Sequence, residues 1–480
     1  MRLSVGFVSL GCPKNLADTE RMIGLLSGAG FTITGDQSQA DVAVINTCGF
    51  LEAAKNESLS TIQEFVDSKK AGSLRGLIVA GCMTERYLQL MADKFPEVDA
   101  FIQVRDFSKI LETMESIQAG DAETLRRRRA LIGELSQLEG HSELPDFEKR
   151  APGIRPYAYV KIAEGCNRTC SFCIIPKLRG KLHSRSIQGI VDEVRQLASF
   201  GTKEIILIAQ DLTSYGRDRD DSASLLRLME QIESVEGIEW IRLNYNYPRF
   251  FSDDLIDFLA NSKRFSKYLD IPFQHSSDAV LKRMRRPESA FEIRSLIEKL
   301  RAKMPDISLR TTLMVGFPGE TEEDFQDLLS FLKWAKLENV GAFKYCREEG
   351  TPSYDLPDQI SEDVKDRRYA ELMGLQKKLQ KKRLGEIVGS TRLVMVDSFM
   401  ETTKQGHIFR GRHSGQAPEI DGVCYIVSDE RLAVGSIIPV AIQKIIGDYD
   451  LLGVPNAEVA ELVHKSSGGA FVSYGLPSGR

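Results

Sequence analysis

The chain has 480 residues, of which 42% are hydrophobic and 27% are charged, a composition typical of folded domains. Its net charge of −5 excludes a global basic field of the kind that attracts nucleic acid. No apolar run is long enough to cross a membrane, and the N-terminus lacks the cleavage site of a signal peptide. The length predicts about three domains, and we expect a cytoplasmic protein.

Residues 1–118 alternate buried strands with helical segments, so they predict an α/β domain built on a parallel sheet. The predicted strands span residues 5–10, 41–46 and 76–80. Because parallel strands end at the same edge of a sheet, the loops that follow them should lie close together. That edge is where open α/β sheets build their sites.

Cys12, Cys48 and Cys82 follow these three strands, one on each loop. Each stands beside a glycine, which lets the backbone approach a bulky ligand. Eight cysteines in a chain of this length favour metal binding or catalysis over disulfides. The three thiolates therefore predict an iron–sulfur cluster with one iron left open. The alternative is three buried cysteines that act as small hydrophobes.

A second triad, Cys166, Cys170 and Cys173, has CxxxCxxC spacing. Three thiolates can hold three irons of a cubane cluster and leave the fourth open to a small molecule. Zinc is the alternative, but it prefers four closed ligands or paired CxxC units, and the sequence offers neither here. The spacing resembles that of the radical S-adenosylmethionine (SAM) enzymes, and the resemblance implies that the open iron binds SAM.

This triad belongs to a domain predicted to span residues 153–381, after a linker at residues 119–152. Six strands separated by helices predict a partial parallel (β/α)6 barrel, with its site at the carboxyl ends of the strands. The strands are expected at residues 158–163, 204–209, 240–244, 268–271, 309–315 and 341–345. The linker contains the arginine run 126–129, which is either a solvated helix face or a contact for RNA phosphate.

Three residues of the barrel are candidates for binding the cofactor SAM. Gly316 and Gly319 lie in a loop that follows a strand and opens a helix, where close backbone approach and the helix N-terminus favour a carboxylate. The alternative is a plain strand-to-helix turn. Gln210 ends the second strand and, with Asp211, could bind ribose or amine groups. Three further residues with reactive side chains are predicted to be structural: His275, Cys346 and Cys424.

From residue 384 to residue 454 the pattern changes to short strands without long helices, punctuated by Gly and Asp. This pattern predicts a small all-β barrel. Residues 455–480 are rich in Ser and Gly, so we expect a disordered tail.

The cysteine motifs and their flanks resemble those of the methylthiotransferase family of radical SAM enzymes. The matching segments are Ser9–Asn15, Asn46–Phe50, Gly81–Met83, Glu164–Asn167 and Arg179–Gly180. The resemblance implies a flavodoxin-like N-terminal domain, a radical SAM barrel and a C-terminal β-barrel called TRAM. It also implies two [4Fe-4S] clusters, one on each triad, and SAM as methyl donor and radical source. The implied reaction inserts a methylthio group into a C–H bond.

Two segments resemble the RimO branch of that family: Cys-Pro-Lys at residues 12–14 and Ala-Pro-Glu-Ile-Asp-Gly at residues 417–422. This resemblance implies that the substrate is the β carbon of an aspartate of small-ribosomal-subunit protein twelve. An electron donor such as flavodoxin or ferredoxin would be a second partner. Glu419 and Asp421 are expected to form an acidic turn that attracts a basic ribosomal protein and repels phosphate. An ordinary acidic turn is the alternative.

Two other functions compete with this one. Within the family, the alternative is a tRNA adenosine methylthiotransferase. Outside it, the alternative is a non-catalytic RNA-binding iron–sulfur protein. The acidic turn counts against both. The second complete cysteine triad counts against the binding protein, since simple binding needs no radical cluster.

Overall fold

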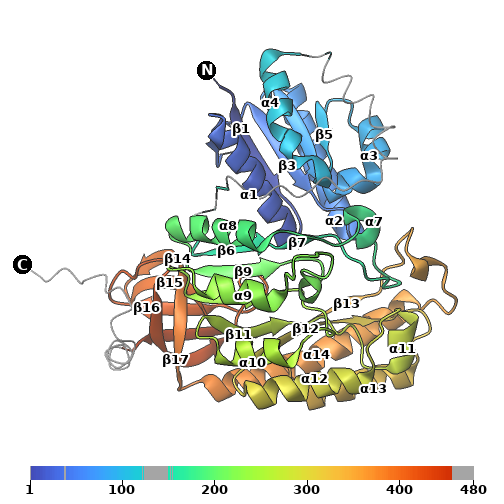
Figure 1. The fold of residues 1–480 in the computed structure, drawn as a ribbon, viewed down its shortest axis with the longest axis vertical. Coiled ribbons are helices and arrows are strands. Elements are labelled where there is room, and N and C mark those ends of the chain that lie inside the picture. The colour runs from blue at the N-terminus through green and yellow to red at the C-terminus, as the bar shows by residue number, and fades with distance from the viewer. Residues whose placement is uncertain are drawn as a thin grey trace, which may run out of the picture.

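The computed structural model describes residues 2–36, 39–121, 123, 150, 151, 153 and 155–456. Figure 1 shows an N-terminal α/β unit above a central α/β unit, with a C-terminal β-barrel at one end of the central sheet. Most of the predicted linker, including Arg126 to Arg129, and nearly all of the predicted tail lie outside the described residues. No helix in the described part of the chain is long and apolar enough to cross a membrane.

Five parallel strands form the N-terminal sheet in the order β2-β1-β3-β4-β5. They are β1 (Ser4–Ser9), β2 (Thr32–Thr34), β3 (Val42–Thr47), β4 (Gly76–Gly81) and β5 (Ala100–Ile102). The helices are α1 (Pro13–Gly28), α2 (Glu52–Lys70), α3 (Cys82–Lys94), the 3-10 helix η2 (Val104–Lys109) and α4 (Ile110–Ala119). This strand order is that of flavodoxin-like folds, which confirms the predicted fold. The sequence pattern missed β2 and β5, because three residues are too few to show a period.

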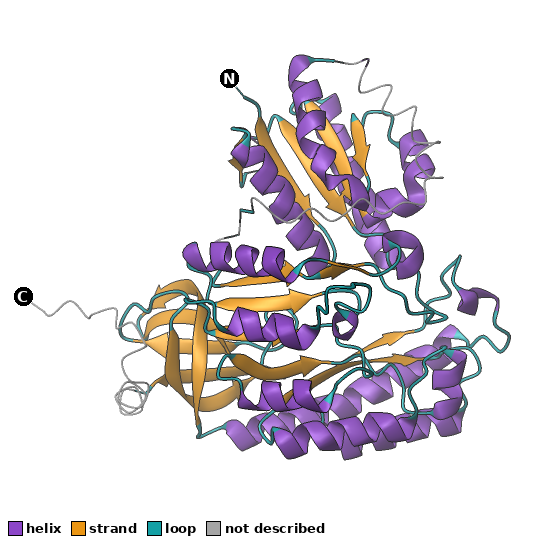
Figure 2. Cartoon of the chain, viewed as in Figure 1, coloured by secondary structure: helices purple, strands orange, loops and turns teal. Residues whose placement is uncertain are grey.

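Six parallel strands form the open sheet of the central unit, in the order β13-β12-β11-β10-β9-β6. Figure 2 shows the strands of the chain in orange with the helices beside them in purple. They are β6 (Tyr157–Lys161), β9 (Glu204–Ile208), β10 (Trp240–Leu243), β11 (Phe265–Asp270), β12 (Ser308–Val315) and β13 (Asn339–Lys344). The longer helices are α8 (Ile187–Ser199), α9 (Leu225–Glu233), α10 (Asp253–Asn261), α12 (Ala290–Lys303), α13 (Glu322–Ala335) and α14 (Glu362–Ile387). The short elements are β7 (Ala163–Glu164), α7 (Ile175–Arg179), β8 (His183–Ser184), η3 (Leu212–Ser214), α11 (Asp278–Arg283) and η4 (Pro352–Asp355). All six predicted strands are present, and the partial barrel is confirmed.

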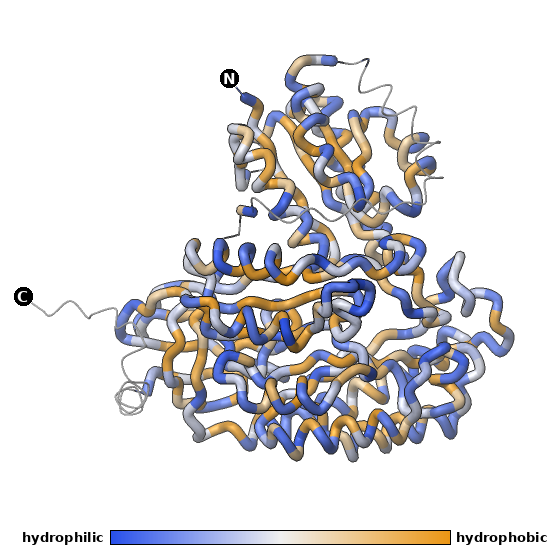
Figure 3. The backbone as a smooth tube through the Cα atoms, viewed as in Figure 1, coloured by the Kyte–Doolittle hydropathy of each residue, from blue (hydrophilic) through white to orange (hydrophobic). Residues whose placement is uncertain are grey.

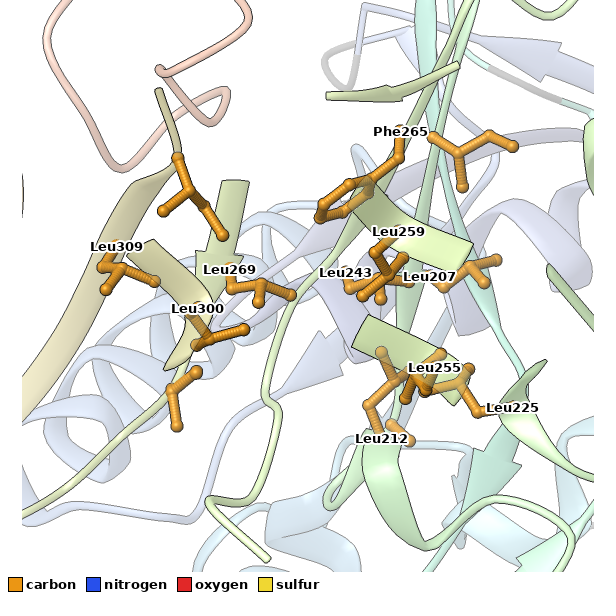
Figure 4. Packing of buried hydrophobic residues seen from close by; sticks show 14 of the residues in the cluster. Leu207, Leu212, Leu225, Leu243, Leu255, Leu259, Phe265, Leu269, Leu300 and Leu309 are labelled. Atoms are coloured by element: carbon orange, nitrogen blue, oxygen red, sulfur yellow. The ribbon is translucent and has the colours of Figure 1, made fainter. Parts of the chain in front are cut away.

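One large hydrophobic core holds most of these strands and helices together, and smaller clusters lie beside it. Figure 3 shows the central strands as mostly hydrophobic runs. Leu207, Leu243 and Leu269, from three neighbouring strands, pack in the same core as Leu255 and Leu259 of α10 (Figure 4). Burying each leucine contributes about 1.5–3 kcal/mol to stability. The sheet is therefore stabilised by the apolar middle of its strands and not by the loops that follow them. The carboxyl ends of the strands are therefore free to carry polar and cysteine residues without loss of the fold.

The C-terminal unit is a closed barrel with the strand order β14-β15-β16-β18-β17. Its strands are β14 (Thr391–Thr403), β15 (Gly406–His413), β16 (Cys424–Ser428), β17 (Ile437–Ile446) and β18 (Asp450–Pro455). Val394, Phe409 and Leu451 belong to its buried core, and Cys424 of β16 packs among them. The predicted all-β barrel is confirmed, and the burial of Cys424 agrees with a structural role.

The turn that carries Glu419 and Asp421 packs against the central sheet. Asp421 accepts hydrogen bonds from Tyr268 (2.8 Å) and Arg310 (2.6 Å), and only 1% of its side chain is exposed. Glu419 accepts hydrogen bonds from Arg155 (2.9 Å) and Tyr157 (3.0 Å). The expectation of an exposed acidic pair is therefore wrong for Asp421, because cationic and phenolic groups of the sheet cover its carboxylate. The turn joins the barrel to the central unit.

Candidate active site

All six cysteines of the two triads line one cavity of about 500 Å³ between the N-terminal and central units. Cys12 caps the start of α1, Cys48 lies between β3 and α2, and Cys82 begins α3 directly after β4. The other triad lies in the loop between β7 and α7. The structure thus brings together the six residues that the sequence singled out. Their role as cluster ligands stays a prediction.

Two glycines let the N-terminal loops converge. Gly11 has φ +90°, and a Cβ there would lie 2.7 Å from the Cβ of Cys48. Gly81 has φ +101°, and a Cβ there would lie 2.3 Å from the Oδ1 of Asn46. Any side chain at either position would push the loops apart, so only glycine fits. The side chain of Asn15 ties the loops further by donating to the backbone carbonyls of residues 10 (3.0 Å) and 47 (2.9 Å).

The barrel triad is held by its own backbone contacts. The amide of Cys166 donates to the carbonyl of Gly180 at 3.0 Å, which closes the loop at its base. Ser171 donates through its amide to Met284 (2.9 Å) and through its hydroxyl to Arg283 (2.8 Å). These contacts fix the direction of the loop, so its three cysteine side chains share one opening.

Burial raises the pKa of several thiols of the site. It raises the pKa of Cys82 and of Cys166 to about 11 and that of Cys173 to about 12. It also raises the pKa of Cys48 and Cys170. These thiols therefore hold their protons until a metal displaces the protons, and metal binding would release them.

Each triad offers three cysteine sulfurs as possible metal ligands. Within the described residues, no three His, Cys, Asp or Glu side chains come close enough together to hold a single metal ion. A cubane cluster places its thiolate ligands on separate irons, so they stand farther apart than the ligands of one zinc ion. The donor set of each triad, three cysteine thiols, fits a [4Fe-4S] cluster with one iron left open.

Arg179 joins the two triads, and nothing in the sequence assigned it a role. Its guanidinium donates to the sulfur of Cys82 (3.0 Å) and to Asn15 (2.7 Å), both in the N-terminal unit. It also pairs with Glu164 (2.9 Å), two residues before Cys166. Although burial alone would raise the pKa of Glu164, the charges of Arg179 and Lys161 hold it well below its usual range. The carboxylate therefore stays charged and holds Arg179 in place.

The three predicted SAM contacts differ in their placement. Gln210 lines the cavity, donates to Glu164 at 2.5 Å, and leaves its buried carbonyl oxygen without a hydrogen-bond partner among the described residues. Such an orphaned acceptor is the kind of group that a ligand satisfies. Gly316 and Gly319 are not among the described residues that line the cavity, and the side chains of Lys365 and Arg283 pack against them. A SAM contact stays a prediction for all three residues, and of the three only Gln210 lines the cavity.

Two residues predicted to be structural have different surroundings. His275 is buried, accepts a hydrogen bond from the amide of Ser277 at 3.0 Å, and has its pKa lowered to about 4 by burial. Its placement agrees with the prediction. Cys346 lines the cavity with the two triads, with its sulfur 3.8 Å from Glu348. The chain pattern did not indicate this, since no partner cysteine is spaced to accompany it.

The backbone is strained where the cavity meets the central sheet. Tyr245 has φ +65° and Gln274 has φ +72°, both in the left-handed region that side chains disfavour. They follow β10 and β11, and both line the cavity. Strained residues persist where the surrounding structure holds them and are often found at functional sites.

The ammonium of Lys14 lies over the ring of Tyr245, 2.9 Å from the centroid of the ring. Burial lowers the pKa of Lys14 to about 8.

Comparison with known protein families gives one match for each unit of the fold. Residues 160–332 match the Radical SAM superfamily, residues 4–103 match the uncharacterized protein family UPF0004, and residues 388–455 match the TRAM domain.

Curated relatives match nearly the whole chain. The ribosomal protein uS12 methylthiotransferase RimO of Geotalea uraniireducens is 44% identical over 94% of this chain and 97% of its own. The protein of that name from Geobacter sulfurreducens is 44% identical over 94% of this chain and 98% of its own. The one from Aquifex aeolicus is 42% identical over 97% of this chain and 100% of its own.

A solved structure supports the fold at low sequence identity. The radical S-adenosylmethionine methyltransferase TsrM from Kitasatospora setae, with cobalamin and a [4Fe-4S] cluster bound, aligns with a TM-score of 0.54 and 13% identity. The alignment covers 82% of this chain and 81% of that one.

Proposed function

The chain belongs to the RimO family of radical SAM methylthiotransferases, and we propose that it inserts a methylthio group at the β carbon of an aspartate of ribosomal protein uS12. One observation carries the proposal. Three cysteines from the loops of the N-terminal sheet and three from one loop of the central unit line the same cavity. Two clusters held there would lie within reach of one substrate.

The cofactors are two [4Fe-4S] clusters and SAM. When bound, they supply the radical that takes a hydrogen from the substrate and the sulfur and methyl groups that replace it. The thiols of each triad would hold one cluster. The single cavity would let a substrate carbon reach both.

Other side chains of the site would bind the cofactor and hold the cysteine loops in position. Arg179 holds the N-terminal loops against the barrel loop through Cys82 and Glu164. Gln210 offers its orphaned carbonyl oxygen to a donor such as an amine or a ribose hydroxyl of SAM. The cavity lies between the two units, and its lining is mostly apolar, which limits the water around a reactive radical.

The substrate assignment rests on the relatives, since each of the three named above is called a uS12 methylthiotransferase. The acidic turn does not support it, because Asp421 is buried against the sheet. A ribosomal protein as substrate implies a cytoplasmic enzyme. The radical chemistry implies an electron donor, for which we propose flavodoxin or ferredoxin.

The test offers both candidate substrates to the same enzyme. Anaerobically reconstituted protein is given SAM, a reductant, uS12 and tRNA, and the products are analysed by mass spectrometry. We expect a gain of about 46 Da, the replacement of H by SCH₃, on one aspartate of uS12 and no change in tRNA. Methylthioadenosine in tRNA with unmodified uS12 would overturn the proposal in favour of the tRNA branch.

A further inference from the structure

The charged side chains that line the cavity are, with one exception, paired inside the described part of the protein. Arg168 pairs with Asp211 at 2.7 Å, and Arg286 pairs with Glu288 at 2.5 Å. The cavity-lining Glu348 pairs with Arg86 at 2.5 Å. Arg179 pairs with Glu164, as described above.

Lys14 is the exception. It lines the cavity, and among the described residues it has no hydrogen bond or ion pair to a carboxylate. Its ammonium lies over the ring of Tyr245, across the boundary between the N-terminal and central units. The residue is 8% exposed, so bulk water does little to solvate its charge. The carboxylates of Asp270 and Glu164 attract this charge only from beyond ion-pair distance. A buried cation with no carboxylate in contact is costly unless a ligand supplies one.

We propose that Lys14 binds the carboxylate of the substrate aspartate. This inference rests on the proposed function and names the group that selects its substrate. The reacting β carbon is bonded directly to that carboxyl group, so a carbon placed in the cavity brings the carboxylate in with it. Lys14 is the lining cation left free to receive it.

The same charge would discriminate between substrate classes. An aspartate side chain carries a carboxylate, and an adenine base carries none. An unpaired ammonium in a water-poor cavity therefore favours the protein substrate and gives the base nothing to compensate it.

The test compares two forms of uS12 on variants of the reconstituted holoenzyme. One form carries the target aspartate and the other carries asparagine in its place. Binding of each is measured anaerobically by fluorescence anisotropy. The unmodified enzyme should prefer the aspartate form by about tenfold or more, the effect of one charge-assisted hydrogen bond. Lys14→Met should bring the ratio of the two dissociation constants close to one, and Lys14→Arg should keep part of the preference.

Lys55→Met is the matched control. The ammonium of Lys55 also lies over a tyrosine ring, that of Tyr87 at 4.6 Å, but Lys55 is not among the residues that line the cavity. This variant should keep the full preference for aspartate. Iron content is measured on every variant, so that a loss of cluster is told apart from a loss of recognition.

Three outcomes would overturn the inference. If Lys14→Met keeps the preference of the unmodified enzyme, the carboxylate is bound elsewhere, while the proposed function stands. If Lys14→Met and Lys14→Arg both lose about half of their iron, Lys14 serves the N-terminal cluster instead. If the unmodified enzyme binds neither form of uS12 and modifies tRNA, the proposed function fails and the inference fails with it.

Discussion

The roles of several side chains in the site depend on contacts with residues that are far away in the sequence. The six cysteines could be predicted, because their spacing and their places after strands are visible in the chain. Arg179 and Lys14 could not, since their roles follow from contacts with Cys82 and Tyr245 in another unit. A buried basic residue looks like a surface residue until its partners are known.

The side chain of Glu320 makes stability depend on pH. It is fully buried, and it accepts hydrogen bonds from the amides of Gly316 and Phe317. Burial raises its pKa from 4.5 to about 7, although the charge of Arg368 opposes the change. The folded state therefore holds this proton more tightly than the unfolded chain. The group lowers stability progressively as pH rises from about 4.5 to 7, by roughly 3 kcal/mol in all.

Replacing Glu320 with Gln should remove this dependence. The thermal midpoint of the unmodified protein should fall relative to that of Glu320→Gln between pH 5 and pH 7, then stay parallel to it at higher pH. Glu322→Gln is the control, because hydrogen bonds from Arg367 and Gln326 lower the pKa of Glu322 to about 2. Its effect should not change across this window. Parallel curves for Glu320→Gln and the unmodified protein throughout would show that the carboxyl is already ionised at pH 5.

Among the strands and helices, the longer strands were predictable, and the way the units pack together was not. The central strands are apolar runs bounded by polar loops, so each was visible by itself. The turn at residues 417–422 was visible too, but its acidic residues did not reveal Arg310 and Tyr268, more than a hundred positions earlier. A charge pattern shows which charged groups a segment contains, but it does not show whether other parts of the fold already pair with them.

The packing of the turn at residues 417–422 leads to a prediction about stability. Asp421→Ala should lower the free energy of unfolding by about 3 kcal/mol, since it leaves the mostly buried charge of Arg310 with only the more distant carboxylate of Asp270, at 4.0 Å. Glu419→Ala is the matched change on the same turn, and 46% of that side chain is exposed. It should cost about 1 kcal/mol or less. Denaturant unfolding checks both, and equal losses for the two variants would contradict the assignment.

Across the molecule, ion pairs hold the N-terminal unit over the carboxyl ends of the central strands. Arg150 bridges Glu20 of α1 and Glu193 of α8, and Lys161 of β6 pairs with Asp18 of α1. These pairs join residues that are up to 143 positions apart. No local pattern reveals them. They explain why two triads on separate sheets face the same cavity.

If both triads act on one substrate within one chain, removing either should stop the reaction at a different stage. In one variant Cys12, Cys48 and Cys82 are changed together to alanine, and in the other the barrel triad is changed in the same way. Each variant should hold about four irons instead of about eight, and only the first should cleave SAM. Iron analysis and detection of 5′-deoxyadenosine check these outcomes.

The decisive measurement mixes the two variants with SAM, reductant and uS12 and determines the mass of uS12. Because the cavity takes its cysteines from a single chain, we expect SAM cleavage by the first variant and no gain of about 46 Da on uS12. Methylthiolated uS12 from the mixture would contradict this arrangement, since the two triads would then act in separate molecules.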